Sequence, residues 1–135
     1  AGSLCKSKGA KRVVALKVSG AFHSPLMRPA VAGLDQALAG VEFRDPGIPV
    51  IANATAEPVR SASDARRLLR DQVTSPVRWV GCMERAASLV PGATFVEIGP
   101  GNVLSGLVKR SVPNAQTVTL GTADEIEKYL HTADV

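Results

Sequence analysis

His23 is the residue whose type and setting best suit chemistry. It lies in the stretch VSGAFHSPLM, after a run rich in β-branched residues and before a serine-proline pair. An imidazole exchanges protons near neutral pH, so His23 could act as a general base. Ligands also gather at strand ends in α/β sheets. His131, the other histidine, falls in the last turn of an expected helix, where a positive charge suits the dipole and needs no function.

A catalytic base requires a group that orients it and a nucleophile that it activates. Ser24 is adjacent in sequence, but its place before Pro25 predicts that it caps the next helix. No Gly-x-Ser-x-Gly elbow occurs in the 135 residues. From the residues alone, His23 is therefore one half of a site.

The glycine turn GPGNVL, which follows TFVEI, is the second candidate. A strand, a glycine turn and a helix can bind phosphate through the helix N-terminal amides. Gly99 and Gly101 match a dinucleotide fingerprint, but its third glycine is replaced by Leu104, and no Gly-Lys-Ser/Thr follows. We expect a tight turn in which glycine supplies positive φ angles, with a nucleotide-binding half domain as the weaker alternative.

The composition, with 45% hydrophobic and 21% charged residues, is typical of a globular domain. No apolar run approaches the roughly 20 residues that cross a bilayer, so no membrane association is expected. Cys5 and Cys82 are isolated, which predicts neither a metal site nor a disulfide and favours a reducing compartment, with Cys82 buried in a helix. The net charge of +4 suits acidic partners, whereas five aromatic residues offer little for nucleic acid.

Strands and helices are expected to alternate in the first half of the chain. Residues 1–9 read as the end of a helix, 12–19 as a strand and 24–38 as a helix stopped by Gly40. Residues 48–53 read as a strand covered on both faces. The core-facing residues of the helix at 24–38 recur every four positions, and they are Leu26, Ala30, Leu34 and Leu38.

The second half continues this alternation. Ser61 or Ser63 starts a helix at 63–72, and Pro76 opens another at 77–90. Residues 94–98 form the clearest buried strand, followed by a helix to about 110, a strand at 116–120 and a helix at 124–131. This order predicts an α/β fold with a largely parallel sheet.

Four runs of sequence carry a resemblance to a known family: KRVVALKVSGAFHSPLM, IPVIANATAEPV, LLRDQVTSPVRW and TFVEIGPGNVLSGLVKR. In this order they resemble the C-terminal half of malonyl-CoA:acyl carrier protein transacylases and polyketide synthase acyltransferase domains. The resemblance implies an α/β-hydrolase-like acyltransferase layer with a mostly parallel sheet. Residues 1–18 would be the last helix and strand of an inserted ferredoxin-like subdomain, and residues 19–135 the C-terminal part of the large subdomain.

The family works by ping-pong transfer, in which an elbow serine takes malonyl from coenzyme A and passes it to the phosphopantetheine thiol of acyl carrier protein. By the resemblance, His23 takes the serine proton and later protonates the leaving thiol. Gln72 matches the residue whose backbone carbonyl orients the imidazole. The family's serine, oxyanion-hole glutamine and malonyl-binding arginine belong to an N-terminal half that these residues do not include.

Two further residues are implied to bind substrate. Phe22 stands where related acyltransferases separate malonyl from α-methyl units, a steric effect of about 1–3 kcal/mol. Core packing is nearly as good an account of Phe22. Asn102 would line the same cleft, although its place before a helix favours capping.

The resemblance therefore implies part of a malonyl transacylase that needs its N-terminal half, with no cofactor and no metal. Its implied partners are that half, acyl carrier protein and the coenzyme A thioester, in the cytoplasm or in an organelle such as a plastid or mitochondrion. Fatty acid and polyketide synthesis both remain open. A non-catalytic module that binds acidic carrier protein is the alternative. We expect the chain alone to expose an unpaired sheet edge and to aggregate, dimerise or retain a partner.

Overall fold

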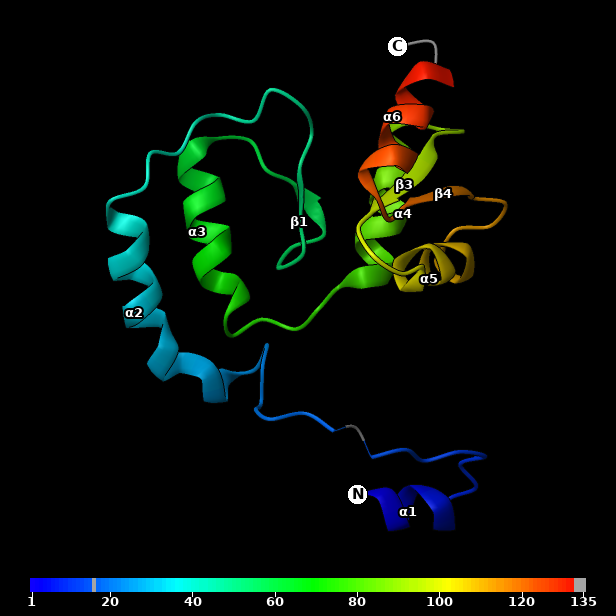
Figure 1. Ribbon diagram of the computed structural model, residues 1–135. Coiled ribbons are helices and arrows are strands. Elements are labelled where there is room, and N and C mark those ends of the chain that lie inside the picture. The colour runs from blue at the N-terminus through cyan, green and yellow to red at the C-terminus, as the bar shows by residue number, and fades with distance from the viewer. Residues whose placement is uncertain (16, 133–135) are drawn as a thin grey trace.

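The computed structural model describes residues 1–15 and 17–132, and it is a mixed α/β structure (Figure 1). In Figure 1, the segment that contains the first helix lies away from the rest of the chain. The elements, in chain order, are α1 (Gly2–Ser7), the 3₁₀ helix η1 (Pro25–Met27), α2 (Arg28–Ala39), β1 (Ile51–Ala52), β2 (Glu57–Pro58), α3 (Ala62–Gln72), α4 (Trp79–Leu89), β3 (Thr94–Ile98), α5 (Val103–Ser111), β4 (Gln116–Leu120) and α6 (Ala123–Thr132).

The parallel pair of β3 and β4 organises the C-terminal part of the structure. Thr94 lies opposite Gln116, and the register continues to Ile98 opposite Leu120. Helix α5 connects the two strands and packs on both, while α4 contacts α5. Both strands have the bounds expected from the sequence. Full burial of β3 was wrong, because Ile98 is 71% exposed and the residues of this strand alternate between exposed and half-buried.

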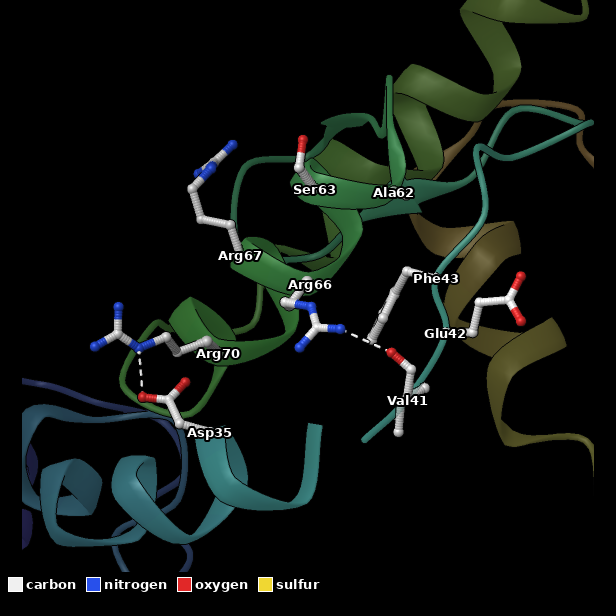
Figure 2. Close-up of a pocket in the computed structure, with 9 residues that line it drawn as sticks. All are labelled: Asp35, Val41, Glu42, Phe43, Ala62, Ser63, Arg66, Arg67 and Arg70. Atoms are coloured by element: carbon white, nitrogen blue, oxygen red, sulfur yellow. Dashed lines mark hydrogen bonds and ion pairs between the residues drawn. The ribbon is translucent and has the colours of Figure 1, made fainter. Parts of the chain in front are cut away.

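Helices α2 and α3 pack together, and Arg66 of α3 ties them to the loop that joins α2 to β1 (Figure 2). Its guanidinium donates hydrogen bonds of 2.7 Å to the carbonyls of Leu38 and Val41. It also lies 4.9 Å from the centroid of the Phe43 ring. The Leu38 carbonyl, at the C-terminal end of α2, also accepts a 3.1 Å bond from the Val41 amide, so Arg66 adds a second donor there and holds the start of the loop.

The helix expected over 24–38 is divided. Residues 25–27 form the 3₁₀ turn η1, and α2 begins only at Arg28. A 3₁₀ helix has fewer residues per turn than an α-helix. Different residues of α2 therefore point inward than in the continuous α-helix expected over 24–38. Leu26 and Ala30 are therefore exposed, contrary to the expected pattern. The half-buried apolar row consists of Met27, Val31, Leu34 and Leu38.

Two expected strands are wrong in whole or in part. Residues 12–15 and 17–19 form no strand, and residue 16 lies outside the described residues. Val14 and Val18 are 57% and 68% exposed, so the β-branched residues are present but no neighbouring strand in the described chain pairs with them. The strand expected at 48–53 is reduced to β1, which pairs antiparallel with β2. A strand forms only where a second backbone satisfies its N–H and C=O groups.

The remaining helices follow the sequence closely. Ser61 caps α3, because its Oγ accepts a 3.1 Å bond from the Asp64 amide. Helix α4 starts two residues later than expected, at Trp79, and ends before Pro91. In the described chain, no helix is both long and apolar enough to span a membrane.

Candidate active site

His23 lies in a strained turn immediately before η1. Its φ angle is 57°, in the left-handed region that most residues with a side chain avoid. Ser24 holds this turn: its hydroxyl donates a 2.7 Å bond to the Ala21 carbonyl and accepts a 3.3 Å bond from the Leu26 amide. Pro25 then starts η1. The turn leaves the imidazole exposed in the described structure.

The tertiary structure brings Gln72, the last residue of α3, to His23. The Nδ1 atom of His23 lies 3.2 Å from the Gln72 carbonyl oxygen, although the residues are 49 positions apart. The last carbonyls of a helix have no partner within it, so this oxygen is available to the imidazole. The Ser75 amide donates a second, 3.3 Å bond to the same oxygen.

The side chain of Gln72 also faces the imidazole. Its Nε2 lies 2.9 Å from His23 Nδ1 and donates a 3.1 Å bond to the Ser75 carbonyl. Its Oε1 accepts a 2.6 Å bond from Nδ2 of Asn53, the residue that follows β1. Asn53 was missed in the sequence because it reads as a polar residue that closes a strand. Its place at a strand end was the signal that could have marked it.

Phe22 and Asn102 were the other expected site residues. Phe22 directly precedes His23 and is 59% exposed, so core packing does not account for it in the described structure. Asn102 occupies the N-cap position of α5 without a capping hydrogen bond from its side chain. No hydrogen bond among residues 1–15 and 17–132 joins either residue to His23 or Gln72.

Glu97 of β3 takes the capping role that Asn102 lacks. Its carboxylate accepts bonds of 3.1 and 2.7 Å from the amides of Leu104 and Ser105. Contact with the Ser105 side chain, then these amide bonds, lower the pKa of Glu97. The amides that would cradle a phosphate are thus already bonded, which argues against a nucleotide site at this turn. Gly99 and Gly101 have φ angles of 130° and 102°, as expected for a tight turn.

A cavity of about 540 Å³ between α2 and α3 holds none of the expected site residues (Figure 2). Its three arginines already have partners. Arg67 pairs with Asp64 at 2.9 Å, and Arg70 pairs with Asp35 at 3.0 Å. Arg66 bonds backbone carbonyls, as described above. We therefore assign this cavity a structural role.

A second, largely apolar cavity of about 350 Å³ adjoins the His23 cluster and includes Asn53 and Gln72 in its lining. Most of its wall is aliphatic, contributed by Val50, Ile51, Val59, Leu68 and Leu69. Across the described ranges, no three His, Cys, Asp or Glu side chains gather in a way that could hold a metal ion. Cys82 is buried, and burial raises its pKa, whereas Cys5 is exposed.

No protein-family model matches the chain. Individual relatives do. The malonyl CoA-acyl carrier protein transacylase of Bacillus subtilis (strain 168) is 39% identical over 133 residues, which is 98% of this chain and 41% of that relative.

Solved structures give the same result. The acyl-carrier-protein-S-malonyltransferase from Bartonella henselae aligns with a TM-score of 0.86 and 41% identity, over 98% of this chain and 42% of that chain. A malonyl-transacylase in complex with its type II PKS acyl-carrier protein aligns with a TM-score of 0.84 and 36% identity, over 96% of this chain and 42% of that chain. The chain therefore spans about two fifths of the length of these relatives.

Proposed function

Because this chain belongs to the malonyl CoA-acyl carrier protein transacylase family and matches its C-terminal portion, we propose that it forms part of an enzyme that transfers malonyl from coenzyme A to acyl carrier protein. The observation that carries this proposal is the contact of 3.2 Å between His23 Nδ1 and the Gln72 carbonyl. A carbonyl in that place can orient an imidazole as the carboxylate of a catalytic triad does.

We assign the proton transfers to His23. Its Nε2 takes the proton of a serine hydroxyl while the serine oxygen attacks the malonyl carbonyl, and the imidazolium then protonates the coenzyme A sulfur as the C–S bond breaks. In the second half-reaction, His23 takes the proton of the phosphopantetheine thiol. It returns this proton to the serine oxygen when the ester bond breaks. The serine would come from polypeptide beyond these 135 residues, and the reaction needs no cofactor.

We further propose that Gln72 orients His23 and that Phe22 and Asn102 border the bound acyl group. The exposed ring of Phe22, next to His23, supports a steric role towards the α-carbon of the acyl unit. The Asn102 side chain makes no capping hydrogen bond to α5, which supports a role outside the helix itself.

The proposed division of the chain assigns residues 1–18 to a small ferredoxin-like subdomain and residues 19–135 to the large one. The separation of α1 from the rest of the structure supports this division (Figure 1). The exposed residues Val14 and Val18, which lie in no helix or strand, also support it, because they could pair with further strands of a small subdomain. We place the enzyme in the cytoplasm, where two unpaired cysteines remain reduced.

The proposal is tested by adding the N-terminal portion of the Bacillus subtilis relative to this chain and measuring malonyl transfer to acyl carrier protein. We expect transfer with both parts present and a loss of at least about 100-fold in kcat for His23→Ala. His131→Ala, which changes the other histidine, is the matched control and should keep full activity. Transfer that survives His23→Ala in a folded protein would refute the proposed role.

Two observations favour a second function. A similar malonyl-transacylase has been solved with an acyl-carrier protein bound, and this chain has a net charge of +4. The chain could thus bind an acidic carrier protein without catalysis. Binding by the chain alone that weakens steeply with salt, together with no transfer after complementation, would favour this function.

A further inference from the structure

The orientation of the Gln72 side chain is set by a chain of hydrogen bonds that starts at a backbone amide. The Arg78 amide, at the N-cap of α4, donates a 2.7 Å bond to Oδ1 of Asn53. A backbone N–H can only donate, so this bond fixes which end of the Asn53 amide is oxygen. Nδ2 of Asn53 then donates to Gln72 Oε1 at 2.6 Å and to the Pro76 carbonyl at 3.2 Å.

The same argument determines which end of the Gln72 side-chain amide is oxygen and which is nitrogen. Since its Oε1 faces Asn53, its Nε2 must face His23 Nδ1 at 2.9 Å and the Ser75 carbonyl at 3.1 Å. Reversing the Gln72 amide would set oxygen against the Ser75 carbonyl and nitrogen against the Asn53 nitrogen. Reversing Asn53 as well would set its nitrogen against the Arg78 amide. Each reversal leaves polar groups that repel or lack a partner.

Two groups of Gln72 therefore require opposite protonation states of His23 Nδ1. The side-chain Nε2–H needs a lone pair on Nδ1, which puts the proton of the neutral ring on the other nitrogen of the imidazole. The backbone carbonyl at 3.2 Å needs a proton on Nδ1, which leaves the other nitrogen free to act as a base. A neutral imidazole cannot satisfy both at once.

We propose that Asn53 is a positioning residue that controls the tautomer of His23 through the Gln72 amide. In the resting chain, Nδ1 accepts from Gln72 Nε2, and the proton lies on His23 Nε2. The histidine becomes a base when the ring exchanges protons with water, so that Nε2 loses its proton, Nδ1 gains one, and the new Nδ1–H is donated to the Gln72 carbonyl. The catalytic meaning of this switch rests on the proposed function, whereas the tautomer itself is a property of the described residues.

The test is ¹⁵N NMR of the histidine-labelled protein at a pH where the imidazole is neutral, for the chain alone and for the chain complemented as above. In the chain alone, we expect wild-type Nδ1 of His23 to resonate as an unprotonated nitrogen. In Asn53→Asp, both carboxylate oxygens can only accept, so Gln72 turns its Nε2 to Asp and its oxygen to His23. Nδ1 should then resonate as a protonated nitrogen.

Two further variants separate orientation from charge. Asn53→Leu adds no charge and removes the hydrogen bond that orients the Gln72 side-chain amide. Gln72→Met removes that amide and leaves the backbone carbonyl of residue 72 as the partner of His23 Nδ1. In both variants, most of the neutral rings should carry their proton on Nδ1. His131 supplies a reference signal in every spectrum. Asn114→Asp, in the turn before β4, adds the same charge elsewhere and should leave the tautomer of His23 unchanged.

A wild-type ring that carries its proton on Nδ1 in the chain alone would overturn the proposal. So would Asn53 variants that keep the wild-type tautomer, or a shift confined to Asn53→Asp, which would indicate charge alone. Malonyl transfer is measured separately with His23→Ala. If transfer proves independent of His23 while the tautomer shifts as expected, the proposed function fails and the control by Asn53 stands.

Discussion

At the scale of single residues, His23 combines an exposed imidazole with a left-handed backbone at φ 57°. That conformation costs about 1–2 kcal/mol for a residue with a Cβ atom, and the bonds of Ser24 to Ala21 and Leu26 help to hold it. Strain of this kind gathers at functional sites, where the surrounding structure over-determines the backbone. The turn thus holds the ring of His23 against Gln72.

This backbone strain predicts that glycine at position 23 gives a more stable protein than alanine, the reverse of the usual order. His23→Gly should be more stable than His23→Ala by about 1 kcal/mol, because glycine adopts positive φ without a Cβ clash. Urea unfolding followed by circular dichroism measures the difference. Ala32→Gly on the exposed face of α2 is the control, with glycine there expected to destabilise by about 1 kcal/mol. Equal stability of the two His23 variants would show that the turn is not strained.

The two cysteines should differ in reactivity. Cys82 is 7% exposed and burial raises the pKa of its thiol, while Cys5 is exposed. Since the thiolate is the nucleophile, a thiol reagent should label one cysteine quickly and the other only on unfolding. Mass spectrometry counts the labels, and Cys5→Ser should remove the fast one. Fast labelling of Cys82 in the native chain would contradict the described packing.

At the scale of elements, Glu97 joins β3 to α5 by capping the helix with its carboxylate. The Ser105 side chain and the amides of Ser105 and Leu104 lower its pKa, so the folded state holds the charged form more tightly than the unfolded state does. This contribution is present above the unfolded-state pKa, which is near 4.5, and it is lost as pH falls through the lower folded-state value.

Glu97→Gln should therefore lower Tm at neutral pH, by an amount that shrinks steadily below about pH 4.5. Thermal unfolding followed by circular dichroism at several pH values measures this. Glu84→Gln, exposed on α4, removes the same charge away from the α5 cap and should change Tm little. A Tm difference for Glu97→Gln that stays constant from pH 7 to acid would rule out the capping carboxylate as its cause.

Arg66 is the link between α2 and α3. Its two 2.7 Å bonds to backbone carbonyls and its contact with Phe43 predict that Arg66→Ala lowers the free energy of unfolding by about 2–3 kcal/mol. Arg44→Ala is the matched control, because Arg44 is 83% exposed and pairs with an exposed Glu42, so its loss should cost at most about 0.5 kcal/mol. Urea unfolding of both variants tests this, and equal losses would contradict the described link.

At the scale of the whole molecule, the chain buries few apolar side chains and leaves many of them exposed. Four apolar residues and one serine are buried in the described structure. Around β3 and the start of α5, several large aliphatic side chains face outward: Val96, Ile98, Val103 and Leu104. An exposed apolar face of this kind marks an interface or an aggregation site.

We therefore predict that the chain alone self-associates and that adding the N-terminal portion of a relative replaces self-association with a one-to-one complex. Replacing both Ile98 and Val103 by threonine should weaken both kinds of association. Leu130→Thr, on exposed α6, makes a similar change elsewhere and should weaken neither. Light scattering and sedimentation measure self-association and formation of the one-to-one complex. A monomeric wild-type chain that ignores the N-terminal portion would contradict the prediction.

The sequence predicted those parts of the fold whose causes are local. These include a serine cap at Ser61 or Ser63, which the structure places at Ser61, the stop at Gly40, the bounds of β3 and β4, and the positive φ angles of Gly99 and Gly101. All of them depend on residues within about one turn of each other. Strands at 12–19 and 48–53 could not be decided this way, because a strand needs a distant partner that the pattern does not name.

For the candidate site, the residues singled out His23 by type and place, and the family resemblance pointed to Gln72. Only the tertiary structure decided that the Gln72 carbonyl and amide both meet Nδ1, and that Asn53 and the Arg78 amide orient that amide. These bonds join residues 19 to 49 positions apart. Helix caps act within a few residues and can be read from the sequence, whereas bonds between distant segments exist only after α3, α4 and β1 have packed.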